Sequence, residues 1–178
     1  MPSNKPRLHV ALYERGIPDP CGDPSYHWAL IVGPKKETEK TTPAGKRYHA
    51  INTKLPNDTA PWRYEVVNLR RPVTSLLLVR ITIAKVVDQV RLERTLQDIP
   101  VAQRPGFTCR TWVSAAIAAL AKDGGLGTST TMNWDTIQRR GFEYVAEKKA
   151  AGRWKNAGKW KIGMPSTYSM IEGKEMVP

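Results

Sequence analysis

The chain has 178 residues, a hydrophobic content of 40% and a formal net charge of +12, with 28 Lys and Arg residues against 16 Asp and Glu. This length is typical of one domain, and the composition excludes an intrinsically disordered chain. No apolar run approaches the roughly 18 residues of a membrane span, and the first residues lack the apolar stretch of a secretory signal, which together predict a cytoplasmic location.

Short segments rich in β-branched and aromatic residues dominate the first half of the chain. Each is bounded by Pro, Gly, Asn or Asp, and no helical pattern lies between them, which predicts an antiparallel sheet of about five strands. The predicted strands are Leu8–Tyr13, Tyr26–Val32, Lys46–Asn52, Trp62–Leu69 and Leu76–Ile83.

The second half changes to helical periodicity. We expect helices over Val86–Ile99 and Thr108–Leu120, and a third that begins near Asn133 or Asp135. The helix at Thr108 is apolar on most sides and should be buried against the sheet, giving an α+β domain. Residues 1–152 would form the catalytic domain, and residues 153–178 a basic, Trp-containing extension of it.

Cys109 is the first candidate for chemistry. It follows the helix breakers Pro105 and Gly106, has Thr108 as a plausible N-cap, and so is expected in the first turn of a helix. Unpaired N–H groups and the helix macrodipole favour a thiolate there, and a reactive thiol must also be open to solvent. The alternative is that Cys109 is a small buried apolar residue of the core.

Two histidines occur in consecutive predicted strands, His27 and His49. If these strands pair as an antiparallel hairpin across the loop from Gly33 to Gly45, the two imidazoles can lie side by side on one face. His27 would then deprotonate Cys109 and later protonate a leaving group, while His49 holds the tautomer of His27. Glu65 is a second candidate for this third role, and His9 is interpreted as structural.

This arrangement resembles a known superfamily. A His-Trp-Ala strand, a second His in the next strand, and a Cys that opens a helix with a Trp three residues later resemble the permuted papain-like superfamily, which includes the lecithin retinol acyltransferase group. The chain is also similar to uncharacterised fungal proteins with a His-Trp-Ala strand and an Arg-Cys-Gln-Glu-Trp-like helix. The resemblance spans about Leu8 to Leu120 and implies that Cys109 is the nucleophile, His27 its base and His49 the third polar residue.

Further residues are expected around this site. Trp28, Arg110 and Glu65 are candidates for substrate binding, and Cys21 is interpreted as a bystander or a residue of the substrate wall. The backbone N–H of Cys109 is the natural donor of an oxyanion hole. The spacing of the Cys and His residues contains no zinc-binding motif, so no metal and no cofactor are expected.

The positive charge suggests a polyanionic partner. The candidate cations for such a partner are Lys35, Lys36, Lys46, Arg47, Arg70, Arg71, Arg153, Lys155, Lys159 and Lys161. In the tail they alternate with tryptophans, a pattern that can stack bases, although the tryptophans can equally pack back onto the domain.

Three hypotheses about function follow. The first is a Cys/His acyltransferase whose donor is aminoacyl-tRNA or another anion; fungal arginine-containing cyclodipeptide synthases, which take amino acids from charged tRNA, are similar in size and charge. The second is a cysteine amidase or peptidase of the same fold, for which the charge is incidental. The third is a non-catalytic RNA-binding protein in which Cys109 belongs to the core.

Overall fold

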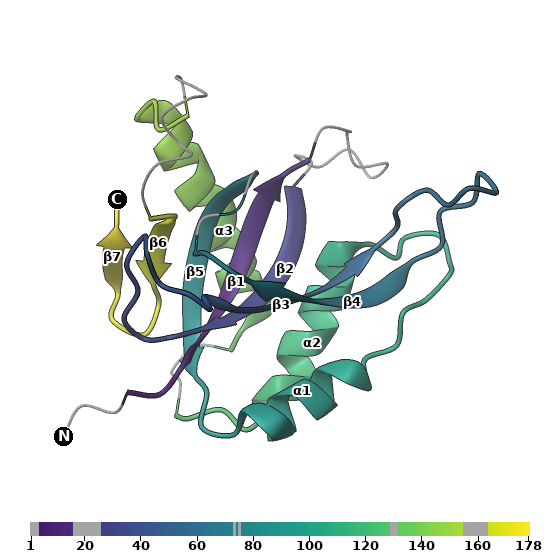
Figure 1. Cartoon of the computed structure of the whole chain (residues 1–178), viewed down its shortest axis with the longest axis horizontal. Helices are drawn as coiled ribbons and strands as arrows, with labels where there is room; N and C mark the ends of the chain where they lie inside the picture. The colour runs from purple at the N-terminus through teal and green to yellow at the C-terminus, as the bar shows by residue number, and fades with distance from the viewer. Residues whose placement is uncertain (1–3, 16–25, 73, 75, 129–131, 155–163) are drawn as a thin grey trace.

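The computed structural model describes residues 4–15, 26–72, 74, 76–128, 132–154 and 164–178 (Figure 1). Within these ranges the chain forms one sheet and three helices. The elements are β1 (Arg7–Glu14), β2 (Tyr26–Gly33), β3 (Gly45–Ile51), β4 (Arg63–Leu69), β5 (Leu77–Lys85), α1 (Gln89–Gln97), α2 (Cys109–Asp123), α3 (Trp134–Ala150), β6 (Ser166–Ser169) and β7 (Lys174–Val177).

The sheet has the strand order β4-β3-β2-β1-β5-β6-β7. All five predicted strands are present, and β1 to β5 pair with one another in antiparallel fashion. The expected β2–β3 hairpin is confirmed, because Leu30 lies opposite Tyr48 and Val32 opposite Lys46. The prediction of an α+β domain with a mostly antiparallel sheet is therefore correct.

The three helices lie on one face of this sheet. In β2, Trp28, Leu30 and Val32 point into the core beneath the helices, while Ala29 and Ile31 belong to a smaller apolar cluster on the other face. Strand side chains alternate between faces, so β1 and β5 sort their residues in the same way. The main core lies between the sheet and the helices.

Each helix begins at a residue whose side chain caps it. Asp88 accepts a hydrogen bond from the backbone of Arg91 at the start of α1, and Asn133 accepts one from Thr136 at the start of α3. Thr108 caps α2 as the sequence predicts, in a capping box with Thr111. None of the helices in the described part of the chain is both long and apolar enough to cross a membrane.

The end of the chain is where the fold departs from the sequence prediction. Two short strands, β6 and β7, lie in the C-terminal segment, whose sequence has no clear hydrophobic periodicity. Strand β6 pairs with β5 in parallel. The connection from β5 to β6 therefore runs through all three helices and returns to the edge of the sheet (Figure 1). Each of these strands has only four residues, most of them polar, so the sequence shows no alternation of apolar and polar side chains that would predict a strand.

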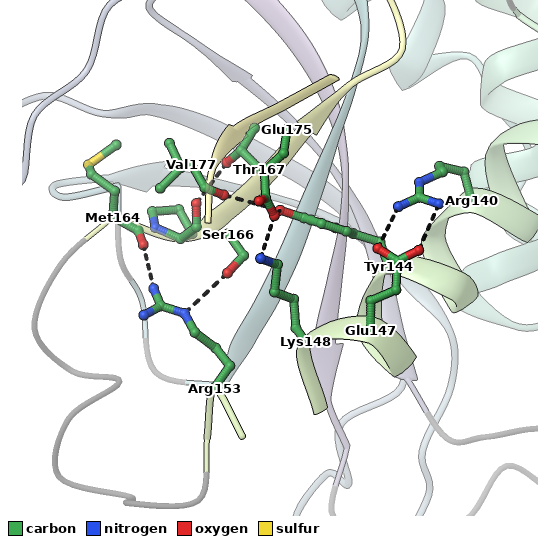
Figure 2. A network of polar contacts seen from close by, with 11 residues as sticks. Arg140, Tyr144, Glu147, Lys148, Arg153, Met164, Ser166, Thr167, Glu175 and Val177 are labelled. Carbon is green, nitrogen blue, oxygen red and sulfur yellow. Dashed lines mark hydrogen bonds and ion pairs between the residues drawn. The ribbon is translucent and has the colours of Figure 1, made fainter. Parts of the chain in front are cut away.

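Polar contacts hold this last hairpin onto α3 (Figure 2). The buried Tyr144 hydroxyl lies 2.5 Å from Glu175 Oε1 and 3.1 Å from the Val177 carbonyl oxygen, and Lys148 forms an ion pair with Glu175. Arg153 donates hydrogen bonds to Ser166 Oγ and to the carbonyl of Met164. The segment from residue 164 onwards is thus part of the domain and completes its sheet.

Replacing Tyr144 by Phe tests this attachment. The variant removes the hydroxyl that reaches β7 but keeps the buried ring, so we expect a loss of about 1 kcal/mol in the free energy of unfolding. Backbone amides of β7 should exchange with deuterium faster than in the wild type. Tyr168→Phe is the matched control, because the structure assigns its hydroxyl no hydrogen bond among the described residues; equal effects of both variants would contradict the attachment.

Candidate active site

The hairpin of β2 and β3 brings the two predicted histidines together. Their rings meet at the face opposite the helices, with 2.7 Å between His27 Nε2 and His49 Nδ1. His49 lies directly opposite Glu65 in the β3–β4 pairing, and its Nε2 is 2.9 Å from Glu65 Oε2. The sequence offered His49 and Glu65 as alternatives for one position, whereas the structure uses both, in series.

This chain of hydrogen bonds determines which ring nitrogens carry protons. As a carboxylate, Glu65 can only accept, so His49 must carry its proton on Nε2. His49 Nδ1 is then an acceptor, which requires that His27 carry its proton on Nε2. The remaining nitrogen, His27 Nδ1, is left with a free electron pair. It is also the ring nitrogen nearer to the backbone of β2.

Both imidazoles are neutral at physiological pH. Burial, followed by the charges of His49, Arg47 and Arg15, lowers the pKa of His27 to about 3. Burial, with Arg47 and Arg63, likewise lowers the pKa of His49 to about 3, even though its ring touches the Glu65 carboxylate. The short contact with Glu65 is therefore a hydrogen bond from a neutral ring, and His27 is an unprotonated base.

Cys109 approaches the same strand from the other side. The paired part of β2 and β3 covers Leu30 to Val32, and no pairing between them continues toward Tyr26 within the described residues of these two strands. There Cys109 Sγ accepts a hydrogen bond from the Trp28 backbone N–H at 3.4 Å and lies 4.0 Å from the carbonyl oxygen of Tyr26. These groups flank His27, so the sulfur lies against the stretch of main chain that carries the base.

One expectation about the thiol is wrong. The sequence interpretation required a sulfur open to solvent, but Cys109 is only 1% exposed and belongs to the core cluster with Trp112 and Val113. The physical reason is that α2 packs against β2 and β3, and Cys109 lies on the side of its first turn that faces these strands. The sulfur is therefore adjacent to polar backbone on one side and to apolar packing on the other.

An open cavity of about 860 Å³ lies over the two imidazoles. Its lining carries three cationic side chains and three acidic ones, so the cavity itself has no marked charge. The titratable and aromatic groups that line it are Tyr13, Glu14, Arg15, His27, Arg47, His49, Lys54, Asp58 and Glu65. A substrate in this cavity would meet the imidazole face of the site.

Tyr13 is a residue of this site that the sequence interpretation missed. It lies directly opposite His27 in the β1–β2 pairing, with ring centroids 6.0 Å apart, and the guanidinium of Arg47 lies 5.2 Å from the centre of its ring. In the sequence, Tyr13 could have been identified only from the residue-by-residue pairing of the first two strands. That pairing depends on its register, which the loop between the strands sets.

The expected substrate-binding residues lie in different places. Trp28 is a correction: it is 2% exposed and packs edge-on against Trp134 and Phe142, because even-numbered residues of β2 face the helices. Arg110 is half-buried in the first turn of α2. Cys21 lies outside the described residues.

The cations proposed for a polyanion are dispersed. Lys46 forms an ion pair with Glu93, Arg47 lies in the cavity described above, and Arg153 holds the last hairpin. Lys35 and Lys36 line a different cavity, and Arg70 and Arg71 are exposed between β4 and β5. Lys155, Lys159 and Lys161 lie outside the described residues, whereas Trp154 packs against the core.

The protein is a small α+β domain in which a buried thiol lies against the strand that carries the first residue of a His–His–Glu hydrogen-bond chain. The chain belongs to DUF6914, a family of unknown function, which it matches over residues 5–177. No curated protein and no solved structure matches it. In the described part of the chain, no group of three or more His, Cys, Asp or Glu side chains is placed to hold a metal ion.

The ring protonation derived above can be measured directly. In protein labelled with ¹⁵N-histidine, we expect His27 and His49 both to be Nε2–H tautomers at pH 7, because Glu65 imposes this order. Glu65→Ala should release the constraint and give a mixture of tautomers for His49. An Nδ1–H tautomer of either residue in the wild type would contradict the hydrogen-bond chain.

Stability should depend on pH because these rings are buried without charge. Since folding lowers their pKa from 6.5 to about 3, the unfolded chain binds more protons below pH 6.5, and the stability present above this pH is lost as the pH falls toward 3. We expect the free energy of unfolding to fall by about 4 kcal/mol between pH 7 and pH 5, about 2 kcal/mol for each ring.

Urea denaturation at the two pH values measures this loss. The double variant His27→Gln/His49→Gln should lose much of the dependence, and a wild type that is equally stable at both pH values would refute the assignment. The carboxylates of Glu93 and Glu175 do not add to the loss, because partners hold their pKa below 4.5, outside this window. Burial also holds the pKa of His9 well below its usual value, so His9 accounts for the dependence that the double variant retains.

Proposed function

We propose that this protein is a thiol-dependent acyl-transfer or hydrolytic enzyme that works through an acyl-Cys109 intermediate. One observation carries the proposal. The sulfur is held against the main chain on either side of His27, while the ring of His27 is fixed through His49 to the Glu65 carboxylate. A nucleophile, a base and groups that orient the base are the parts that nucleophilic acyl transfer requires.

The roles follow from the protonation states. The resting His27 is a neutral imidazole, because its low pKa disfavours a stable imidazolium. In the resting structure the sulfur and the His27 ring lie on opposite sides of β2, so proton transfer requires a local opening that brings the two into contact. As the sulfur then attacks the acyl carbon, its proton passes to His27 Nδ1, and the positive charge that forms is opposed by Glu65 through His49. Collapse of the tetrahedral adduct breaks the bond to the leaving group, which takes the proton from His27.

The second half of the reaction restores the enzyme. Water or another nucleophile gives its proton to His27 and attacks the thioester carbon, and Cys109 leaves as the sulfur that recovers the proton. The N-terminal end of α2, which carries the partial positive charge of the helix dipole, would stabilise the oxyanion. The chemistry requires no group beyond those of the chain and the substrate.

The burial of Cys109 adds a requirement. A sulfur that is 1% exposed meets an acyl carbon only after a local opening of the chain around it. Closing of the chain again after acylation would exclude water from the thioester between the two half-reactions, which favours transfer over hydrolysis when the acceptor is already bound.

The acyl donor is a separate part of the proposal. The net charge of +12 supports a polyanionic donor such as aminoacyl-tRNA, and the similarity in size and charge to fungal arginine-containing cyclodipeptide synthases points the same way. The balanced charge of the cavity over the imidazoles suits a neutral acyl group equally well. A cysteine amidase or peptidase would use the same residues in the same roles.

Intact-protein mass spectrometry with an activated ester tests the proposal. We expect p-nitrophenyl acetate to add one acetyl group to Cys109 under native conditions at pH 7.5, and Cys109→Ala to add none at that position. His27→Gln should slow the addition by about 10²-fold, because it removes the general base while keeping a polar side chain of similar length.

A series at low urea concentrations provides the control. Acetylation through a local opening has a rate that depends weakly on urea, whereas acetylation that requires global unfolding accelerates steeply with urea. Labelling only through global unfolding, or at the same rate in His27→Gln, would show that Cys109 is a core residue and would sink the proposal.

A further inference from the structure

A second cavity lies on the same face of the sheet as the imidazoles, but at the other end of β1. It has a volume of about 570 Å³ and contains none of the residues that line the first cavity. Its floor is made by side chains of β1, β5 and β6 that point away from the helices, and part of its wall by the connection from β2 to β3, which crosses in front of these strands (Figure 1).

The floor of this cavity is polar although it is buried. Six polar side chains that line it are at most 8% exposed, and a seventh forms an equally buried ion pair with one of them. They are Arg7, His9, Arg80, Thr82, Thr167 and Ser169, and Glu37 reaches them from the β2–β3 connection. Burying so many polar groups in one place is unfavourable unless each finds a partner.

Most of these groups do find one. Arg80 pairs with Glu37 at 2.7 Å and donates a hydrogen bond to Thr167 at 3.2 Å. The Nδ1 atom of His9 lies 2.9 Å from the hydroxyl of Thr82. Two buried atoms of the lining, His9 Nε2 and Glu37 Oε1, nevertheless have no hydrogen-bond partner among the residues that the structure describes. Each unsatisfied atom of this kind costs about 1–3 kcal/mol.

The charges around the cavity indicate what would satisfy them. Four cationic side chains, Arg7, Arg80, Lys35 and Lys36, face two acidic ones, Glu37 and Glu172. Burial, with the charges of Arg80 and Arg7, holds the pKa of His9 well below its usual value, so this ring adds no charge. The cavity is therefore electropositive. In the tautomer in which neutral His9 accepts the Thr82 proton at Nδ1, its Nε2 carries an N–H.

We propose that this second cavity is a binding site for a small organic anion, a carboxylate or a phosphate, that also carries a hydrogen-bond donor. The anionic group accepts from His9 Nε2 and faces the cations, while the donor group reaches Glu37 Oε1. The site is independent of Cys109 and of the function proposed above.

Calorimetric titration with two matched pairs of anions tests the site and shows whether it takes a carboxylate or a phosphate. Glycolate and acetate are carboxylates with and without a hydroxyl donor, and glycerol 3-phosphate and methyl phosphate are the corresponding phosphates. We expect saturable binding of at least one donor-bearing anion, and at least ten-fold weaker binding of its partner without the donor. Binding of neither pair, or equal binding within both pairs, would overturn the proposal.

Two variants and one spectrum locate the binding. Lys36→Gln removes an exposed cation at the cavity and should weaken binding several-fold, whereas Lys149→Gln removes the same charge from the exposed end of α3 and should leave it unchanged. In ¹⁵N-histidine-labelled wild type, the ligand should shift the ring nitrogens of His9 and leave those of His27 and His49 in place. Shifts at His27 and His49 alone, or equal effects of the two lysine variants, would refute this location.

Discussion

The alternation of side chains along β1, β2 and β5 organises the whole molecule. Along β1, Leu8, Val10 and Leu12 turn to the helices, while His9 and Tyr13 turn to the opposite face. Because a strand has only these two directions, the buried polar residues Arg7, His9, Arg80 and Thr82 of β1 and β5 lie on the face that the helices leave free. The result is one apolar face, and one face with a polar cavity at each end and a small apolar cluster between them.

Within that arrangement, the candidate site depends on where β2 and β3 separate. They pair from Leu30 to Val32, which sets the register that brings His27 and His49 together diagonally. Beyond Leu30, the backbone N–H of Trp28 meets the sulfur of Cys109 instead of a neighbouring strand. A longer β2–β3 ladder would satisfy this N–H with a carbonyl oxygen and leave no room for the sulfur.

Burial controls the chemistry proposed for this site. Neutral imidazoles and a thiol closed to solvent form a resting state without separated charges, which a low-dielectric interior favours. Charge then has to develop during the reaction, and Glu65, at the half-exposed end of the chain of hydrogen bonds, is the group that opposes it. At the other end of the same face, two charged groups are buried, but Arg80 and Glu37 compensate each other as an ion pair.

The sequence alone determined the elements with strong periodicity. Five strands, three helices, the cap at Thr108 and the pairing of the two histidine strands could be read from it, because alternation, helical spacing and turn residues are local properties. The proximity of His27 and His49 followed from that pairing. The polar strands β6 and β7 had no such local signal.

Only the tertiary structure decided which face each residue occupies and what covers it. It placed Trp28 in the core, closed Cys109 to solvent, linked Glu65 to His49 and turned His9 toward a cavity with Glu37. These outcomes depend on register and on contacts between segments distant in the chain, and a shift of one residue in a strand would reverse every one of its side chains. No local pattern in the sequence contains that information.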